Sequence, residues 1–316
     1  MGIKLAIVMD PIMNINIKKD TSFAMLLEAQ RRGYELYYIE MADLYIDSGQ
    51  PFASCQKLRA KEDATGWFEL DERNDVPLHN FDVVLMRKDP PVDGEFIYAT
   101  HILELAERQG SLIVNKPQSL RDFNEKLFTT WFAEFTPPTL VTASKNRIKA
   151  FHAEHQDIIC KPLDGMGGTS IFRVSPDGTN LGVIAETLTD NGQRYAMFQR
   201  YLPEIKDGDK RVLIVDGEVI PYCLARLPTG NETRGNLAAG GTGRPQPISE
   251  SDQALAEAIA PTLVERGLLF VGLDVIGDRI TEINVTSPTC VREIEAAYDI
   301  NICAKLFDAI EKRISC

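Results

Sequence analysis

The chain has 316 residues, of which 44% are hydrophobic and 25% are charged, a composition typical of a globular protein with more than one folded unit. Acidic residues outnumber basic residues by 46 to 34, and the net charge is −12. This balance argues against a protein that binds nucleic acid through a broad basic surface, although small anions can bind in local basic pockets.

The amino-terminal sequence lacks the pattern of a secretory signal. Its apolar run, at residues 3–9, is too short for a signal peptide or a membrane span. We therefore expect a cytoplasmic protein that does not associate with a membrane. The six cysteines include no Cys-x-x-Cys pair, so neither a zinc site nor a disulfide framework is indicated.

Strand and helix patterns alternate at the start of the chain. Residues 3–9 predict a strand, the stretch from Thr21 to Gly33 predicts a helix, and residues 35–39 predict a second strand. Such an order favours a right-handed parallel crossover, so we expect an open α/β sheet. Further strands are expected at residues 82–86 and 112–114.

The region between these strands is polar. Residues 47–78 show no periodic apolar pattern, and we interpret them as a loop with short pieces of structure that leaves the sheet.

The pattern changes in the second half of the chain. A helix is expected over residues 120–132, followed by hairpin-like strands with turns at residues 164–168, 177–178 and 216–217. Antiparallel pairing is therefore expected to replace the parallel crossover. The predicted fold class is an open parallel α/β sheet followed by two α+β subdomains.

The common nucleotide-binding fingerprints are absent from the sequence. The first strand ends at Asp10-Pro11 without the glycine trio of a dinucleotide site, and no GxxxxGK[ST] motif occurs. A bound nucleotide must be held in another way.

A glycine-rich turn between two predicted strands is one candidate for this. Lys161 ends the first strand, and Gly165, Gly167 and Gly168 follow it. Glycines let backbone N–H groups approach an anion closely, and the lysine supplies a positive charge. An ordinary glycine hairpin with a surface lysine would show the same pattern.

A second constellation predicts a metal site. Residues 269–284 form two predicted strands, and a three-residue turn at 277–279 places Asp274 opposite Glu282. Asn284 shares a face with Glu282 because side chains alternate along a strand. Two carboxylates and one amide oxygen favour magnesium or manganese, whereas a solvated sheet face is the alternative.

A hairpin and a long glycine-rich segment lie between these two motifs. The hairpin, at residues 208–219, carries Arg211 as a rigid anion contact. Residues 227–245, which include Arg234 and Arg244, are interpreted as a mobile lid that would exclude water from a reactive intermediate. A disordered surface loop is the alternative.

Taken in order, these motifs resemble the ATP-grasp superfamily, and more closely the prokaryotic glutathione synthetases. The resemblance rests on Asn124-Glu125-Lys126, Lys161 to Gly168, Gln199 to Leu202, Gly208 to Arg211, Asp274, and Glu282 to Asn284. It implies a substrate-binding α/β domain at 1–122, an ATP-grasp subdomain with the ATP lid and hinge at 123–202, and a second one with the metal site at 203–316.

The resemblance also implies roles for individual residues. ATP would be bound by Lys126, Lys161, Gly165, Gly167, Gly168, Gln199, Tyr201 and Leu202. Mg²⁺, or Mn²⁺, would be bound by Asp274, Glu282 and Asn284. Arg211, Arg226 and Asp209 would be catalytic, and the substrates would be bound by Arg226, Arg234, Ser287 and Thr289.

The implied reaction is the ATP-dependent joining of γ-glutamylcysteine and glycine through an acyl phosphate. The family habit implies a homo-oligomer, specifically a tetramer, that acts on small molecules. Two alternatives remain at this point. One is another ATP-grasp carboxylate–amine ligase, such as a D-alanine–D-alanine ligase or a glutamate-adding peptide ligase, and the other is a non-catalytic ATP-binding module.

Overall fold

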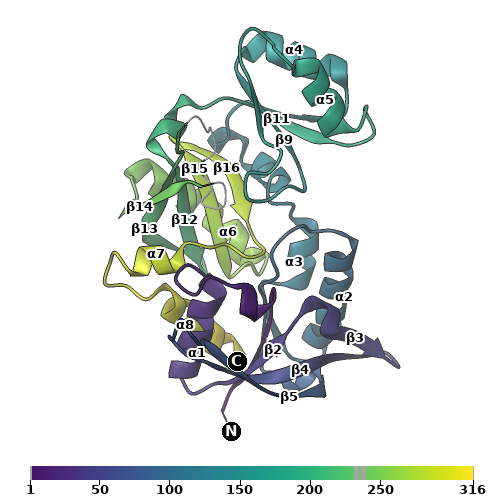
Figure 1. Cartoon of the computed structure of the whole chain (residues 1–316), viewed down its shortest axis with the longest axis vertical. Coiled ribbons are helices and arrows are strands. Elements are labelled where there is room, and N and C mark those ends of the chain that lie inside the picture. The colour runs from purple at the N-terminus through teal and green to yellow at the C-terminus, as the bar shows by residue number, and fades with distance from the viewer. Residues whose placement is uncertain (1, 231–234, 236–239, 316) are drawn as a thin grey trace.

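The structure, a computed structural model, describes residues 2–230, 235 and 240–315. Three sheets follow one another along the long axis of the molecule (Figure 1). The amino-terminal sheet lies at the bottom of this view, the sheet that contains β12 and β15 lies in the middle, and β9 and β11 lie at the top with α4 and α5.

The first sheet has the strand order β3-β4-β2-β1-β6-β7, with β5 paired to β4. As predicted, its centre is parallel, because β1 pairs in parallel with β2 and β6, and β6 with β7. The strands are β1 (Lys4–Val8), β2 (Glu35–Ile39), β3 (Leu44–Asp47), β4 (Gln50–Ala60), β5 (Phe68–Pro77), β6 (Val83–Met86) and β7 (Leu112–Val114). The helices of this region are α1 (Thr21–Arg31), α2 (Gly94–Arg108) and α3 (Pro117–Asp122).

The interpretation of residues 47–78 as a loop is wrong. They form most of a long antiparallel pair, β4 and β5, which extends the first sheet beyond β2. Ala53, Cys55 and Leu58 of β4 are buried, so this strand does carry an alternating apolar face. Strand β5 is mostly exposed and is held in place by its pairing with β4, which a local pattern does not reveal.

The predicted helix over residues 120–132 is interrupted. Helix α3 ends at Asp122, and a 3₁₀ segment, η4 (Leu127–Phe135), begins after a break. The side-chain oxygen of Asn124 accepts hydrogen bonds from the N–H groups of Lys126 and Leu127, which gives these backbone groups a local partner in place of a continuous helix.

The second sheet is antiparallel and has the order β10-β9-β11-β8. Its predicted turn at residues 164–168 joins β9 to β10, whereas the turn at 177–178 leads from β10 to a helix and is not a hairpin. The elements are β8 (Thr139–Thr142), α4 (Lys145–His155), β9 (Ile158–Pro162), β10 (Phe172–Val174), α5 (Leu181–Thr189) and β11 (Ala196–Arg200).

The third sheet is antiparallel as well, in the order β14-β13-β12-β15-β16. Asp216 and Gly217, both with positive φ, form the predicted hairpin turn between β12 and β13. The elements are β12 (Asp209–Val215), β13 (Glu218–Leu227), β14 (Thr242–Pro247), α6 (Glu250–Glu265), β15 (Phe270–Ile276), β16 (Arg279–Asn284), α7 (Val291–Glu295) and α8 (Ile302–Ile314). Short 3₁₀ segments complete the list, namely η1 (Ile12–Asn14), η2 (Met41–Asp43), η3 (Leu78–Asn80) and η5 (Pro203–Asp207).

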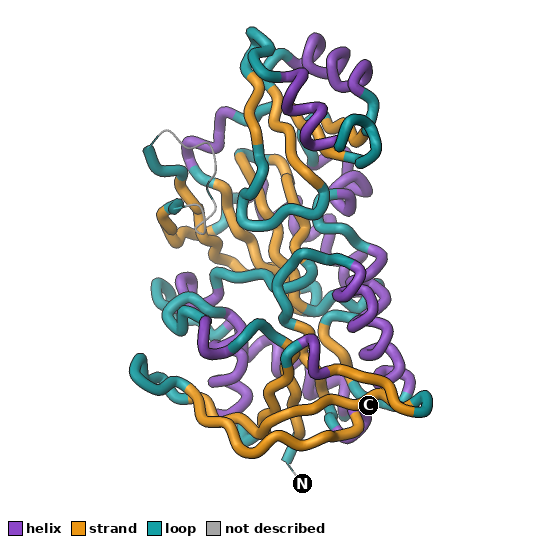
Figure 2. Tube along the Cα trace, turned by 45° about the vertical axis from the view of Figure 1, so that its right-hand side comes forward, coloured by secondary structure: helices purple, strands orange, loops and turns teal. Residues whose placement is uncertain are grey.

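Apolar packing joins the first and third sheets. One buried cluster contains Val84 of β6 and Val271 of β15, and another contains Leu5 of β1 and Phe307 of α8. The second sheet packs in a cluster with α4 and α5 around Phe198. In Figure 2 the strands of this second sheet stand apart from the strands at the amino-terminal end. The boundaries at 122/123 and 202/203 stay predictions.

Candidate active site

Three adjoining cavities run from the second sheet, past the third sheet, to the carboxyl ends of the first-sheet strands. The first cavity, which Gln199 and Tyr201 line, is called the nucleotide-side cavity because the resemblance predicts ATP beside these residues. It shares Asp274 and Glu282 with the next, or middle, cavity. The middle cavity and the amino-terminal cavity share Asp89, Ser287 and Thr289. The three cavities therefore adjoin one another, and together their walls collect side chains from all three sheets.

The two acidic residues predicted to bind metal lie opposite each other on the β15–β16 hairpin. Asp274 pairs with Glu282, and Gly272 pairs with Asn284, across a two-residue turn rather than the three-residue turn expected. All of the predicted donors, Asp274, Glu282 and Asn284, line the middle cavity. The Nδ2 group of Asn284 donates to the Gly272 carbonyl at 3.1 Å, which orients the amide.

Two buried arginines hold Asp274. Arg211 Nε lies 2.7 Å from Asp274 Oδ1, and an Arg226 terminal nitrogen lies 2.9 Å from Oδ2. Burial by itself would raise the pKa of Asp274, but the two guanidinium groups hold it well below its usual range. Gly272 makes room for this pairing, because a Cβ there would lie 2.8 Å from Arg211 Cδ.

Asp209 pairs with Arg226, whose terminal nitrogen lies 2.5 Å from Asp209 Oδ2. Burial raises the pKa of Asp209 to about 6, and the nearby charge of Asp274 adds to this effect while Arg226 opposes it. Its Oδ1 atom is buried and has no hydrogen-bond partner among the described residues. Gly235, in the glycine-rich segment, packs on this pair, since a Cβ there would lie 2.2 Å from the Arg226 carbonyl oxygen.

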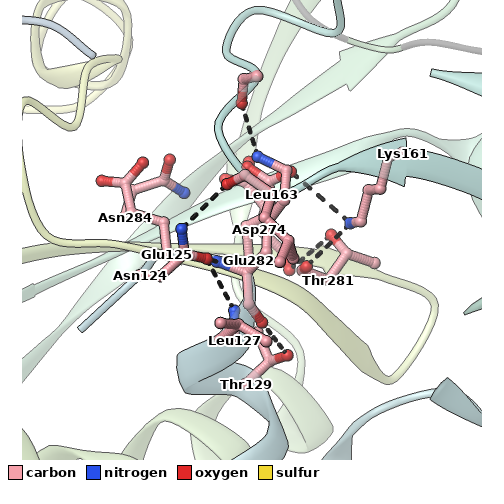
Figure 3. A network of polar contacts seen from close by, with 12 residues as sticks. Asn124, Glu125, Leu127, Thr129, Lys161, Leu163, Asp274, Thr281, Glu282 and Asn284 are labelled. Carbon is pink, nitrogen blue, oxygen red and sulfur yellow. Dashed lines mark hydrogen bonds and ion pairs between the residues drawn. The ribbon is translucent and has the colours of Figure 1, made fainter. Parts of the chain in front are cut away.

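Two lysines from different elements converge on Glu282, and Figure 3 shows one of them, Lys161, beside the hairpin that carries Thr281 and Glu282. Lys126 Nζ and Lys161 Nζ lie 3.4 Å and 3.7 Å from Glu282 Oε1. Both side chains are buried, and burial lowers the pKa of Lys161, with Lys126 adding to the effect. Two ammonium groups beside one carboxylate leave positive charge that a phosphate would neutralise.

The glycine-rich turn lies over the middle cavity. Lys126 Nζ donates to the Gly165 carbonyl at 2.6 Å, and Gly165 and Gly167 are part of the cavity wall. Gly167 and Gly168 have φ values of 61° and 82°, in the left-handed region that favours glycine. A Cβ at Gly165 would lie 2.9 Å from Pro162 Cγ, so the turn is too tight there for a side chain.

The nucleotide-side cavity is largely apolar. Gln199, Tyr201 and Leu202 line it, together with Pro137, Ile159, Ile171, Ile205 and Ile276. Gln199 donates to Thr139 Oγ1 at 3.1 Å, and the Arg173 guanidinium lies 3.7 Å from the centre of the Tyr201 ring. An apolar wall of this kind, with polar side chains such as Gln199 beside it, fits a flat aromatic base.

The amino-terminal cavity contains residues to which the sequence analysis gave no role. It is lined by Asp10, Asp20, Ser22, Arg87 and Asp89 as well as Ser287 and Thr289. Arg87 is buried, donates to Ser22 Oγ and to the Pro288 carbonyl, and its pKa is lowered to about 10 by burial. Asp10 follows β1, and Arg87 and Asp89 follow β6, at the carboxyl ends of parallel strands. This position was the signal by which the sequence could have indicated them as site residues.

The structure thus brings together the predicted site residues that it describes. Lys126, Lys161, Gln199, Tyr201, Leu202, Gly165, Gly167, Asp209, Arg211, Arg226, Asp274, Glu282, Asn284, Ser287 and Thr289 lie on or beside the walls of the three cavities. Gly168 lies in the same turn as Gly165 and Gly167. Arg234 and seven other residues of the predicted lid, 231–233 and 236–239, lie outside the described residues, whereas 242–245 belong to β14.

Comparison with known proteins decides the family. Residues 3–121 match the prokaryotic glutathione synthetase N-terminal domain, and residues 125–299 match the prokaryotic glutathione synthetase ATP-grasp domain. The chain belongs to the prokaryotic glutathione synthetase family. It is 67% identical over 312 residues to the glutathione synthetase of Escherichia coli (strain K12) and 65% identical over 312 residues to that of Vibrio parahaemolyticus serotype O3:K6, with 99% of each chain covered in both cases.

Solved structures agree on the fold. D-cycloserine synthetase DcsG superimposes with a TM-score of 0.67 at 17% identity, covering 98% of this chain and 99% of that chain. ATP-grasp ligase PsnB, solved with a minimal precursor, gives 0.63 at 18% identity with 99% of each chain covered. At these identities the likeness shows the fold alone.

Family membership confirms the predicted fold class and the predicted class of enzyme. This member of the glutathione synthetase family is an ATP-grasp ligase that uses ATP and acts on small molecules. Over the part of the chain that the structure describes, no helix combines the length and the apolarity needed to cross a membrane.

Proposed function

We propose that the chain synthesises glutathione by activating the cysteinyl carboxylate of γ-glutamylcysteine with ATP and joining it to glycine through an acyl phosphate. Full-length relatives named glutathione synthetase support the overall reaction. The observation that carries the proposed route is that the three cavities adjoin, since they share the Asp274–Glu282 pair on one side and Ser287 and Thr289 on the other.

ATP is proposed to lie with its base in the apolar nucleotide-side cavity, beside Gln199, Tyr201 and Leu202. Lys126 and Lys161 then lie where the phosphates would enter the middle cavity, and Gly165, Gly167 and Gly168 cover these phosphates with backbone N–H groups. The excess positive charge of the two lysines beside one glutamate supports this orientation.

Mg²⁺, with Mn²⁺ as an alternative, is proposed to be held by Asp274, Glu282 and Asn284. The donor set fits, because two carboxylates and an amide are the hard oxygen ligands that these ions prefer, and all three residues line one cavity. When bound, the ion would neutralise the charge that develops on the transferred phosphoryl group.

Arg211 and Arg226 are proposed to hold the substrate carboxylate and to stabilise the charge on the acyl phosphate. Both are buried and converge on the middle cavity, where a fixed guanidinium costs little reorganisation during the reaction. Asp209 orients Arg226 from the opposite side through its 2.5 Å contact. The chain needs no nucleophilic side chain for this chemistry, because positioning and charge neutralisation suffice.

The dipeptide is proposed to extend from the middle cavity into the amino-terminal cavity. Asp10, Asp20 and Asp89 offer carboxylates for its ammonium group, and Arg87 offers a buried cation for its γ-glutamyl carboxylate. Glycine is placed at Ser287 and Thr289, which line both cavities. A homotetrameric assembly in the cytoplasm completes the proposal and rests on the family resemblance.

An assay of ADP release tests this proposal. We expect ADP to form rapidly with γ-glutamylcysteine plus glycine, in step with glutathione, and to stay near background with D-alanine or with glutamate-tailed peptides. Faster release with D-alanine or with the peptides would assign the chain to one of those ligase activities. Equal background release with every substrate would identify a non-catalytic ATP-binding module and overturn the proposal.

A further inference from the structure

Glu125 has a side chain that no step described above uses. Its Oε1 atom accepts hydrogen bonds from Val285 N at 2.9 Å, Thr286 N at 3.0 Å and Thr286 Oγ1 at 2.8 Å. The partners are 160 and 161 residues away in the sequence. They lie between Asn284, a proposed metal ligand, and Ser287, in the proposed glycine site. Figure 3 shows Glu125 next to Asn284.

The backbone around Glu125 is tied to the same hairpin. Its carbonyl oxygen accepts a hydrogen bond from Ile283 N at 2.9 Å. The next residue, Lys126, reaches both Glu282 and the Gly165 carbonyl, and the preceding Asn124 donates to the Leu163 carbonyl at 3.0 Å. Residues 124–126 therefore bridge the glycine-rich turn on the ATP side and the end of β16 on the acceptor side.

The turn that Glu125 contacts is also held from its other side. Asn115 Nδ2 donates to the Val285 carbonyl at 2.7 Å and to the Phe270 carbonyl at 2.8 Å. The N–H group of Val285 is thus fixed by Glu125 and its carbonyl by Asn115. A backbone segment with both polar groups bonded to side chains, one of them the buried Asn115, has little freedom to move.

The chemistry at this position suits a carboxylate. One ionised oxygen can accept several hydrogen bonds, and such charge-assisted bonds are stronger than neutral ones. Burial raises the pKa of Glu125, and the bonds from Thr286 oppose this by favouring the charged form. Thr286, Ser287 and Thr289 all line the cavity, and the hydroxyl of Thr286 donates to Glu125, so Ser287 and Thr289 supply the other two hydroxyls of this segment.

We propose that Glu125 is a positioning residue for the acceptor half of the reaction, which fixes the Val285–Thr286 turn so that Ser287 and Thr289 present a preformed site to the incoming amine. The inference rests on the proposed function for the identity of that amine, glycine. It predicts that the loss of this carboxylate raises KM for glycine and leaves the Kd for ATP nearly unchanged, because the turn is on the acceptor side and the neighbouring Lys126 is the residue proposed to contact the ATP phosphates.

Substituting Glu125 tests this prediction. In Glu125→Ala we expect KM for glycine to rise about ten- to a hundredfold, because the charge-assisted hydrogen bonds to the turn are lost. The Kd for ATP should change by less than about threefold. Glu125→Gln keeps an acceptor oxygen at the same reach and should recover most of the glycine affinity. Glu154→Ala, in which an exposed α4 carboxylate is lost, is the matched control and should behave as the parent chain.

Hydrogen exchange of the turn gives a readout that does not depend on the substrate. The amides of Val285 and Thr286 should exchange faster in Glu125→Ala than in the parent chain or in Glu125→Gln. If Glu125→Ala does not fold, Thr286→Val, which removes only the hydroxyl contact, should still raise KM for glycine several-fold.

Two results would overturn the inference, namely unchanged exchange of these two amides, or a loss of ATP affinity as large as the loss of glycine affinity. Failure of the proposed function looks different, because the parent chain itself would then form no glutathione while the exchange difference persisted.

Discussion

Replacing Asp274 by asparagine is expected to lower kcat about a thousandfold or more at saturating substrates and magnesium. The substitution replaces a charged metal ligand by a neutral amide and, at the same time, removes the carboxylate that both Arg211 and Arg226 contact. Arg226 then keeps its pairing with Asp209, whereas Arg211 loses the carboxylate with which it pairs, and breaking a buried pair in this way costs about 3–5 kcal/mol of stability. Steady-state ADP release and thermal unfolding measure the two effects.

A control for this variant lies on the same hairpin. Asp278, at the turn between β15 and β16, has a side chain that is 66% exposed and pairs with Arg279. Asp278→Asn should keep near-parental kcat and unfolding temperature, because surface ion pairs contribute little. A kcat for Asp274→Asn within tenfold of the parent, in a folded protein, would contradict the assignment.

Replacing Glu282 by alanine is expected to lower kcat about a hundredfold or more and to raise the magnesium concentration needed for half-maximal rate. Glu282 is a proposed metal ligand, and it is the carboxylate that lies between Lys126 and Lys161. Without it two buried ammonium groups lose the carboxylate between them. The metal ion also loses one ligand, so the ion is no longer held in place beside the phosphates. A titration of the initial rate against magnesium, at saturating ATP, measures the effect.

The matched control is Glu265→Ala at the end of α6, where the side chain is 71% exposed. It should titrate with magnesium as the parent chain does. A Glu282→Ala variant that reaches near-normal kcat at saturating magnesium would show that this carboxylate does not hold the metal.

The sequence predicted which residues meet in the proposed metal and phosphate sites, because the geometry of each is local. Asp274 and Glu282 are separated by one tight turn, and side-chain alternation alone places them opposite each other. The glycine turn after Lys161 is local for the same reason. The convergence of these two motifs with Lys126 is not a local property. It was predicted from the order of the motifs, which resembles that of a known family.

Other features depend on contacts that no local pattern records. Strand β5 has few buried residues, and its antiparallel pairing with β4 holds it in the sheet. The break in the predicted helix after Asp122 comes from the hydrogen bonds of Asn124. Arg87 donates to the Pro288 carbonyl across 201 residues of sequence, a contact in the wall of the amino-terminal cavity that became visible only in the folded chain.

The most direct test of the central claim is to follow oxygen from the dipeptide into phosphate. In the proposed route an oxygen of the cysteinyl carboxylate attacks the γ-phosphorus of ATP, and the same oxygen leaves with phosphate when the glycine amine attacks the carbonyl carbon. With γ-glutamylcysteine labelled with ¹⁸O in both oxygens of that carboxylate, the account predicts one ¹⁸O atom in each phosphate released and one retained in the new amide. Phosphate that carries no ¹⁸O while labelled glutathione accumulates would contradict an acyl phosphate formed at the Asp274–Glu282 site.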